Sequence, residues 1–588
     1  MIPPQVRPRE ISRNRPHPGS PPPARLFLLA AGWVLSQAGL ATSLPAAPPT
    51  LSHLFPAGGQ RGTKVTVTAS GSFTWPVQVW APGIEAVPTA DSGKIDITIP
   101  ADLPADRVWL RLFSAEGASA TFPFQVGTLP EVLEKEPNNS PKTAQKLEGS
   151  SLLVNGVLEG ADVDSFAVEL QAGQTLVAAV EANTALGSPM DAMLQVVSPR
   201  GFVLAENNDD IHLDPRLAYT APQAGLYIVR LFAFPSTPGT NIAYAGGANF
   251  VYRLTLTTGP YITHALPLSA PLPATDPQAP PATIEVTGGN LPPQTRVPLV
   301  KLGTDKLPFS EFDPIDDLRN SSANQVGLGW GPGIANSARV RLTSFTTVPQ
   351  IHSGDPQQPV VLKPSSVATG WLRTKGQADT YTVPLTKGQA VLFSVESRTL
   401  NLLVDPVLVL TDPTGAKVAE VDDTGPTQDC AVSHTAAHNG DYKLTVRDRY
   451  AQFGERCVYR VTARLEQTDF ELNLAADTVT VEPGKPTELV VKVIRRTGPE
   501  GALGPITVEI PSLPPGVTCA PVVSEPTGPT AAEVKLSLTA DGPAVAVPIR
   551  VAGKTAQPAE LQRYARTPAR LGATSDALWL TVLEKKAQ

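Results

Sequence analysis

The chain has 588 residues, enough for roughly three to five domains that each bury their own core. Proline (62) and glycine (46) together make up 108 residues, while charged residues are only 17%, so turns are frequent and long exposed helices are few. The net charge of −7 and the lack of a Lys/Arg cluster beyond residue 25 disfavour a nucleic-acid binder, which needs clustered positive charge. Three cysteines exclude a disulfide-dense scaffold and a cysteine-built zinc site.

The start of the chain has the order of a secretory signal. Five arginines within the first 25 residues precede a mostly apolar run of 15 residues, Leu26 to Leu40, and small residues follow at Ala41 to Ser43. Because the run is shorter than the roughly 20 residues of a membrane span, we expect a signal peptide over 1–44, with an uncleaved anchor as the alternative. The mature chain is expected to be secreted, periplasmic or at the cell surface, with no membrane span.

One module occurs twice in the chain. Residues 160–174 align with 375–389, an offset of 215 (375 minus 160), and further matches follow downstream. Matched positions are Asp164 with Asp379, Phe166 with Tyr381, and Val251 to Arg253 with Val458 to Arg460. Similar opening segments precede the two copies, and an unrelated tail begins near 468. The chain therefore has the order opener, repeat, opener, repeat, tail.

Short strands separated by Gly, Pro and Asn turns dominate every module. In the second copy Val391, Phe393 and Val395 alternate with more polar residues, the period of two expected of a strand with one buried face. A helix is predicted at Ser140-Pro141, because Ser can cap a helix and Pro fits its first turn. The strands predicted in the first copy are 153–158, 165–170, 176–182, 192–197, 202–206, 216–220, 226–232 and 250–257. We therefore predict an all-β fold of tandem β-sandwich modules.

The first copy carries the motifs of a known family. Glu134-Lys-Glu-Pro-Asn-Asn-Ser140 leads to Gly160-Ala-Asp-Val-Asp-Ser-Phe166, and Asp191, Asn207-Asn-Asp209 and Ala221-Pro-Gln-Ala-Gly-Leu-Tyr227 follow. This pattern resembles the bacterial pre-peptidase C-terminal (PPC) domain, well over 131–259 and in degraded form over 351–467. The resemblance implies jelly-roll β-sandwiches of a kind often found C-terminal to secreted peptidases.

The remaining modules resemble immunoglobulin-like folds: the openers are similar to IPT/TIG domains, and the tail has the strand pattern of an immunoglobulin-like sandwich. Below, 131–259 and 351–467 are called the first and second repeat modules. The resemblances divide the chain into a signal peptide (1–44), an IPT/TIG-like sandwich (45–130), a first PPC-like domain (131–259), a degenerate IPT/TIG-like module (260–350), a second PPC-like domain (351–467) and a C-terminal immunoglobulin-like domain (468–588).

The PPC resemblance implies a calcium site, because in that family the acidic arm and the aspartates near the following strand bind Ca²⁺. The residue chemistry agrees, since Ca²⁺ takes about six to eight oxygen ligands. If the arm folds back on the strand, the oxygen donors are Glu134, Glu136, Asn138, Asn139, Asp162 and Asp164. The alternatives are a solvated acidic linker and a glycosidase carboxylate pair. The pair is disfavoured because a linker lacks the pocket that raises one pKa.

The second copy departs from this pattern. Its start, His352 to Pro359, has no acidic arm, and Gln377 stands where the first copy has Asp162. The first copy has four acids at the predicted site, Glu134, Glu136, Asp162 and Asp164. The second copy keeps only Asp379, the match of Asp164, and one carboxylate is too little negative charge to hold the ion. We therefore expect this copy to be free of metal.

Cys430 and Cys457 occur only in the second copy. Export places the chain where disulfides persist, and a bridge closing a loop of about 27 residues would stabilise the fold by roughly 3 kcal/mol. Two readings stay open: a disulfide that substitutes for the metal, or two unpaired buried thiols. Cys519 is free in both.

The sequence contains no HExxH, G-x-S-x-G, P-loop or C-x-x-C motif. We therefore expect not an enzyme but an exported binding or scaffold protein of the bacterial envelope, whose partner is an extracellular or envelope protein or a polysaccharide. The alternative is an accessory or targeting subunit of a secreted peptidase or other hydrolase. Trp80 and Trp330 are candidate contacts for a sugar or protein ligand, with packing at a module rim as the alternative.

Overall fold

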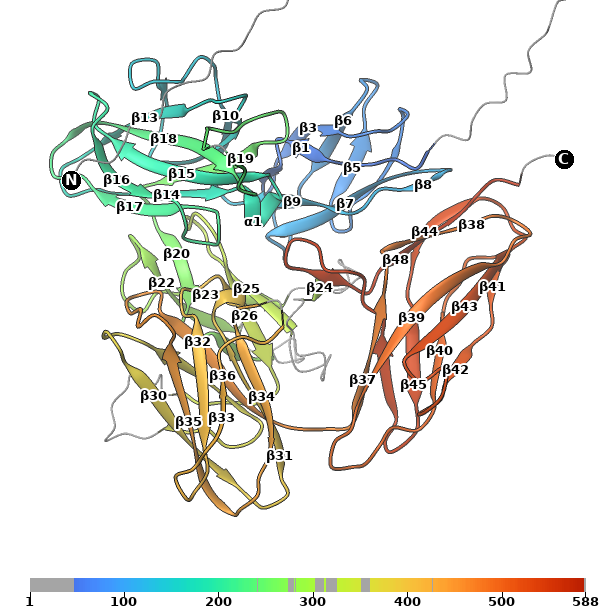
Figure 1. Cartoon of the computed structure of the whole chain (residues 1–588). Coiled ribbons are helices and arrows are strands. Elements are labelled where there is room, and N and C mark those ends of the chain that lie inside the picture. The colour runs from blue at the N-terminus through green and yellow to red at the C-terminus, as the bar shows by residue number, and fades with distance from the viewer. Residues whose placement is uncertain are drawn as a thin grey trace, which may run out of the picture. The chain divides into compact units, whose positions relative to one another are not determined.

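The computed structural model describes residues 47–585 apart from Asn241, Pro426 and the stretches 273–279, 281, 302–310, 313–324 and 350–359. The expected signal peptide (1–44) and the segment His352 to Pro359 lie outside the described residues. Within the described part, every regular element is a strand except the helix α1 (Asn183–Leu186) and the 3-10 turn η1 (Arg398–Leu400), so the predicted all-β fold is confirmed (Figure 1). None of the helices described there is long and apolar enough to cross a membrane.

The first opener has a four-stranded and a five-stranded sheet that share one core. Their strand orders are β1-β3-β6-β5 and β2-β9-β7-β4, with β8 attached to β7. Alternate residues of β6, Ile95 and Ile97, are fully buried and lie in the same core as Leu110 and Phe124 of the other sheet. The strands are β1 (His53–Phe55), β2 (Gly58–Gln60), β3 (Lys64–Ser70), β4 (Gln78–Trp80), β5 (Glu85–Pro88), β6 (Lys94–Thr98), β7 (Arg107–Ser114), β8 (Gly117–Ala118) and β9 (Phe122–Gly127).

The first repeat module has two five-stranded sheets around one core. One sheet has the order β10-β12-β19-β14-β17 and the other β11-β13-β18-β15-β16. The short strands β10 and β11 pair in parallel with β12 and β13, so the entering arm contributes to both sheets. The strands are β10 (Glu131–Leu133), β11 (Gln145–Lys146), β12 (Ser151–Val157), β13 (Asp164–Leu170), β14 (Thr175–Glu181), β15 (Met190–Val197), β16 (Val203–Asn207), β17 (Arg216–Thr220), β18 (Gly225–Pro235) and β19 (Val251–Thr257).

All eight strands predicted for this module are present, within a few residues of the predicted bounds. The helix predicted at Ser140-Pro141 is wrong. There the Thr143 N–H donates to the Ser140 carbonyl (3.0 Å) to close a single turn, and the chain then enters β11. Because β11 pairs with β13 and Leu147 packs against the core, tertiary contacts outweigh the local helix signal.

The second opener has one six-stranded sheet among its described residues, in the order β20-β22-β23-β25-β26-β21. β20 also contacts β26, so the sheet curls around a core that includes Ile262, Val286, Leu299 and Leu342. β24 pairs instead with β47 of the tail. The strands are β20 (Tyr261–Ala265), β21 (Ser269–Pro271), β22 (Thr283–Gly289), β23 (Arg296–Lys301), β24 (Glu311–Phe312), β25 (Gln325–Gly329) and β26 (Ala338–Thr343).

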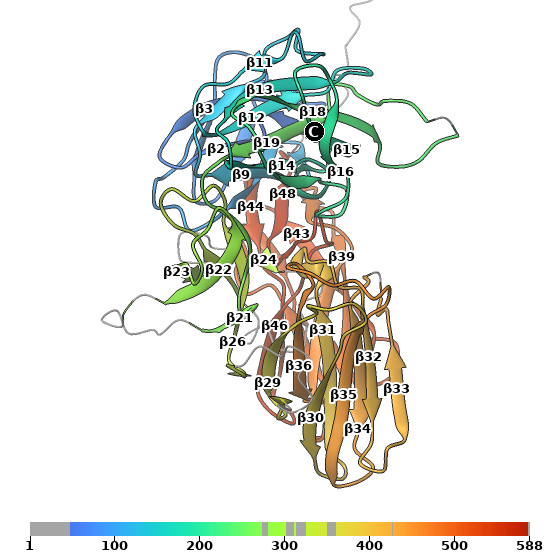
Figure 2. The same ribbon diagram turned by 90° about the vertical axis from the view of Figure 1, so that its left-hand side faces the viewer.

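The second repeat module has the strand orders of the first. Its sheets are β27-β29-β36-β31-β34 and β28-β30-β35-β32-β33, and β33 lies at the rim of the module in Figure 2. Val391, Phe393 and Val395 of β31 are fully buried, as their alternation predicted. The strands are β27 (Thr346–Thr347), β28 (Val360–Val361), β29 (Ser366–Trp371), β30 (Ala378–Leu385), β31 (Ala390–Glu396), β32 (Pro406–Thr411), β33 (Lys417–Val421), β34 (Cys430–Thr435), β35 (Gly440–Asp448) and β36 (Val458–Leu465).

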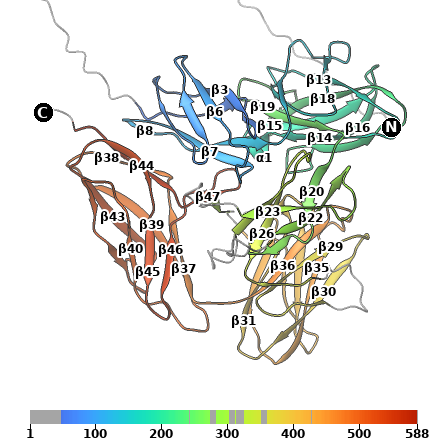
Figure 3. The same cartoon turned by 180° about the vertical axis from the view of Figure 1, so that it is seen from behind.

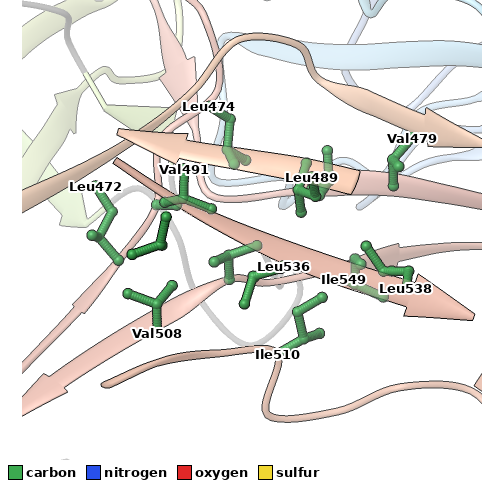
Figure 4. Close-up of a cluster of buried hydrophobic side chains, with 14 of the residues drawn as sticks. Leu472, Leu474, Val479, Leu489, Val491, Val508, Ile510, Leu536, Leu538 and Ile549 are labelled. Carbon is green, nitrogen blue, oxygen red and sulfur yellow. The ribbon is translucent and has the colours of Figure 1, made fainter. Parts of the chain in front are cut away.

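The C-terminal module, in orange and red in Figure 3, arranges its strands around one core as β37-β39-β43-β41, β38-β48-β44 and β42-β40-β45-β46. Val491 of β39 and Leu536 of β43 lie in this core with Val508 and Ile510 (Figure 4). The strands are β37 (Asp469–Leu474), β38 (Thr478–Val481), β39 (Thr487–Arg496), β40 (Ile506–Glu509), β41 (Val517–Cys519), β42 (Val522–Ser524), β43 (Glu533–Ala540), β44 (Val545–Ile549), β45 (Ala552–Thr555), β46 (Leu561–Tyr564), β47 (Thr574–Ser575) and β48 (Leu578–Val582).

The positions of Cys430 and Cys457 bear on the two readings that the sequence left open. Both thiols are free and buried. Cys430 begins β34 and pairs with Val395 of β31, whereas Cys457 directly precedes β36 on the other side of β31. β34 and β36 are therefore two strand spacings of about 4.8 Å apart. This separation exceeds the roughly 7 Å between Cα atoms that a disulfide can span. The alternative of two buried unpaired thiols is the one that the structure has.

We expect the native protein to contain three free thiols, of which Cys519 reacts first with a thiol reagent. Cys519 is only half-buried, whereas burial raises the pKa of Cys430 far above its usual range and that of Cys457 to about 11, so neither is available as a thiolate. Thiol titration of the exported protein should give fast modification of one cysteine, and of all three in urea without reductant. Only one reactive thiol in urea would show that a bridge exists.

Candidate metal site in the first repeat module

An acidic arm connects the two sheets of the first repeat module. It leaves β10 at Leu133, passes the start of β13 and returns as β11. Gln145 closes the arm on itself, because its Oε1 accepts the Lys135 N–H (2.7 Å) and its Nε2 donates to the Leu133 carbonyl (3.2 Å). The arm therefore holds Glu134 and Glu136 against the first residue of β13, Asp164.

Three carboxylates meet at this point. One oxygen each of Glu134, Glu136 and Asp164 lies within 4.8 Å of the others. The Tyr252 hydroxyl, on β19, lies 2.8 Å from Glu134 Oε2 and 2.6 Å from Asp164 Oδ2. Since a phenol has one proton, it donates to only one of the two carboxylates at a time. Asp164 is fully buried, and its Oδ1 has no hydrogen-bond partner among the described residues.

Burial and the neighbouring Glu134 carboxylate raise the pKa of Asp164 to about 10. Burial also raises the pKa of Glu134, although the Val157 N–H donates to its Oε1 (2.6 Å). A fully buried carboxylate beside a half-buried one is costly to ionise unless a positive charge lies between the two. The cluster as it stands therefore requires either a proton or a cation.

The other three predicted ligands lie beside this cluster, and the Asn138 N–H donates to Glu136 Oε2 (2.9 Å). Asn138 is fully buried, its Oδ1 accepts the Ser165 N–H (3.3 Å), and its Nδ2 has no partner among the described residues. Asn139 Nδ2 donates to Asp162 Oδ1, which also accepts the Val163 N–H (2.7 Å). These contacts fix the arm beside β13, and the negative charge of Asp162 adds to the raised pKa of Asp164.

The second repeat module satisfies the matching aspartate without an ion. Gln377 Nε2 donates to Asp379 Oδ1 (2.7 Å) and to the Trp371 carbonyl (2.8 Å). The Tyr459 hydroxyl donates to Asp379 Oδ2 (2.7 Å) and lies 2.9 Å from the Tyr381 hydroxyl. Each oxygen of this buried carboxylate therefore has a donor from the chain itself, where Asp164 has one oxygen without a partner.

Two functional residues of the site were not predicted. Tyr252 donates to the cluster, and Gly156 leaves room for it, since a Cβ on Gly156 would overlap the Tyr252 hydroxyl and Glu134 Oε2. The pair recurs as Tyr459 and Gly370, where a Cβ would overlap the Tyr459 ring. Tyr252 could have been predicted from the repeat, because Val251 to Arg253 matches Val458 to Arg460 and both tripeptides carry a tyrosine at the centre.

The two predicted aromatic contacts both pack within the chain. Trp80, at the end of β4, lies 5.7 Å from the ring of Trp579 between centroids. Trp330 is half-buried, and the guanidinium of Arg61 lies 4.6 Å from its ring centroid. These contacts agree with the packing alternative for both residues, and whether either residue also touches a ligand stays a prediction.

No family model matches the chain, and no curated protein matches it. Among solved structures it is similar to PliG, a periplasmic inhibitor of g-type lysozyme from Aeromonas hydrophila, at 13% identity over 22% of this chain and 97% of that one (TM-score 0.15). It is also similar to the pre-peptidase C-terminal domain of a collagenase from Bacillus anthracis, at 16% identity over 18% of this chain and 96% of that one (TM-score 0.15). Immunoglobulin domains 1–4 of Sidekick-1 match at 10% identity over 89% of this chain and 95% of that one (TM-score 0.17). At these identities and TM-scores, the matches assign no function to the chain.

Proposed function

We propose that this chain is an exported, non-catalytic binding or scaffold protein whose first repeat module is stabilised by Ca²⁺ between the acidic arm and β13. One observation carries the calcium proposal: fully buried Asp164 has an oxygen without a partner, beside Glu134 and Glu136. Buried charges in proteins are paired or bind metals. A cation at this cluster would pair all three carboxylates at once.

The donor set fits calcium. Ca²⁺ prefers oxygen ligands, accepts carboxylates in flexible geometry and keeps some water. Glu134, Glu136 and Asp164 would hold the ion, and the exposure of Glu136 leaves one side open to water ligands. Asn139 and Asp162 offer further oxygens beside them. The bound ion would supply the positive charge that ties the arm to the sheet.

A proton shared by Glu134 and Asp164 is the competing account, because the raised pKa of Asp164 lets this carboxyl hold a proton at neutral pH. The two accounts differ in their response to calcium. A shared proton makes the stability of the module independent of Ca²⁺, whereas a bound ion makes it depend on free Ca²⁺ by mass action.

We expect Ca²⁺ to raise, and EDTA to lower, the temperature of the unfolding transition that belongs to the first repeat module within the full chain. At a free concentration of a hundred times Kd the ion should add about 2.7 kcal/mol to the unfolding free energy of the first repeat module. Asp164→Asn should abolish this response. It should not destabilise the chelated protein, because the new amide can donate to Glu134 as Gln377 does to Asp379. Calorimetry with and without EDTA, with isothermal titration, measures both effects.

Glu169→Gln is the matched control, because Glu169 is an exposed acid of the same strand, β13, far along from the cluster. It should keep the full calcium response. An equal response in wild type and Asp164→Asn would refute the site, and no response in either would support the shared proton.

The non-catalytic role is supported by the absence of catalytic motifs from the sequence and by the use of the three carboxylates between an arm and a strand. The purified chain should be retained on at least one immobilised envelope polysaccharide or protein without releasing fragments of it. Turnover of any such polymer, measured as new reducing ends or peptides, would refute this part of the proposal.

A further inference from the structure

One sheet of the first repeat module has an apolar edge strand, β16. β16 is the last strand in the order β11-β13-β18-β15-β16, and no described strand pairs with its outer side (Figure 1). Phe202, just before β16, is 66% exposed, and Val203 and Leu204 are 48% and 41% exposed. An edge strand offers unpaired N–H and C=O groups, and an apolar one invites pairing with another strand.

The matching edge of the second repeat module is protected. β33 occupies the same place beside β32, with Ala416, Lys417 and Val418 at the positions of Phe202, Val203 and Leu204. Lys417 Nζ forms an ion pair with Glu420 Oε2 (2.6 Å). A lysine on an edge strand is a common device against edge-to-edge pairing, because pairing would strip its charge of water. The register of both strands shifts at the same point, so this β-bulge does not distinguish the two edges.

The charges around β16 are complementary to themselves. Exposed Arg200 precedes the apolar residues, and exposed Glu206 follows them, with Asp209 beyond. Two copies of β16 placed antiparallel about a two-fold axis near Leu204 pair residues 202–206 of each copy and bring Arg200 of one copy between Glu206 and Asp209 of the other. Such an isologous contact uses the same patch on both chains, as most homodimers do.

We propose that β16 is a homodimerisation edge, through which two copies of this chain join their five-stranded sheets into one continuous sheet. Backbone hydrogen bonds along β16 supply the pairing, and Phe202, Val203 and Leu204 supply the apolar contact. An interface limited to one short strand is smaller than the roughly 1,600 Å² of a standard complex. The dimer is therefore reversible and depends on protein concentration.

Sedimentation equilibrium of the full chain tests this dimer. Wild type should form dimers as concentration rises, and Val203→Lys, which places on β16 the residue that β33 has, should weaken the association at least tenfold. Val418→Lys, at an equally exposed position of β33 (40% exposed), is the control and should leave the association unchanged. Melting temperatures should be equal in all three proteins, because both positions are on the surface.

Cross-linking locates the interface directly. In a Cys519→Ser background, Leu204→Cys should form an intermolecular disulfide under mild oxidation, because residues on the axis of an antiparallel pair lie about 4.5–5.5 Å apart. Val418→Cys, at the matching position of β33, should form none. A chain that stays monomeric up to its highest soluble concentration would overturn the proposal, and so would a dimer that Val203→Lys leaves intact.

Discussion

Replacing Arg253 by methionine should lower the unfolding free energy of the first repeat module by about 3 kcal/mol, because the change leaves the carboxylates of Glu131 and Glu181 without their buried cation. Arg253, on β19, is 1% exposed. Its Nη1 and Nη2 donate to the two oxygens of Glu131 (3.0 and 2.9 Å), and its Nε donates to Glu181 Oε2 (3.1 Å). A methionine fills the space but supplies neither charge nor donors.

Hydrogen exchange of the β12 and β19 amides measures this effect within the full chain, where several modules unfold and a single melting temperature is not enough. Arg230→Met, on the neighbouring sheet, is the control, because Arg230 makes only a long contact with Gln195 Oε1 (3.5 Å). It should cost less than about 1 kcal/mol. Equal exchange in the two variants would show that the Arg253 ion pairs contribute nothing net.

Gly156→Ala should also destabilise the first repeat module, by about 3 kcal/mol, and should abolish its response to Ca²⁺. The added Cβ would overlap the Tyr252 ring and Glu134 Oε2. Tyr252 is fully buried and cannot swing out of the way, so overpacking is combined with the loss of its hydrogen bonds to the two carboxylates. Calorimetry with Ca²⁺ and with EDTA measures both results.

Two further glycines separate the causes. Gly225→Ala, on β18, should be neutral, because a Cβ there has nothing within 4 Å. Gly370→Ala should destabilise the second repeat module through Tyr459, to the same extent with and without Ca²⁺. A calcium response that survives in Gly156→Ala would separate Tyr252 from the proposed metal site.

The strands could be predicted because each pattern is local. Val391, Phe393 and Val395 point to one face whatever the rest of the chain does, and a buried face follows from the period of two. The helix at Ser140 failed for the opposite reason. Its residues satisfy a helix start locally, but β13, some twenty residues later, provides the pairing that decides their conformation.

The candidate metal site could likewise be predicted only in part. The arm and the start of β13 were predicted to meet, and the structure brings Glu134, Glu136 and Asp164 together. The sequence could not show that Asp162 would pair with Asn139, since that depends on how the arm closes. The spacing of the acidic residues could not indicate Tyr252 either, because Tyr252 lies on a strand 88 residues beyond Asp164. The sequence left a bridge and two free thiols open, because it does not show that β31 lies between β34, which begins at Cys430, and β36, which follows Cys457.

The order of strands in the two repeats also constrains how the chain is made. β12 ends at Val157, yet its partner β19 begins only at Val251, so during synthesis at roughly 5–20 residues per second β12 waits about 5–20 seconds for its neighbour. During that time β12 has only the short strand β10 beside it, and its other edge is open to another strand. β19 is complete at Thr257, before β29 of the second copy begins at Ser366. The first copy can therefore complete its sheets before β29 of the second copy has been made. Synthesis from the N-terminus thus disfavours an exchange of strands between two modules of the same topology.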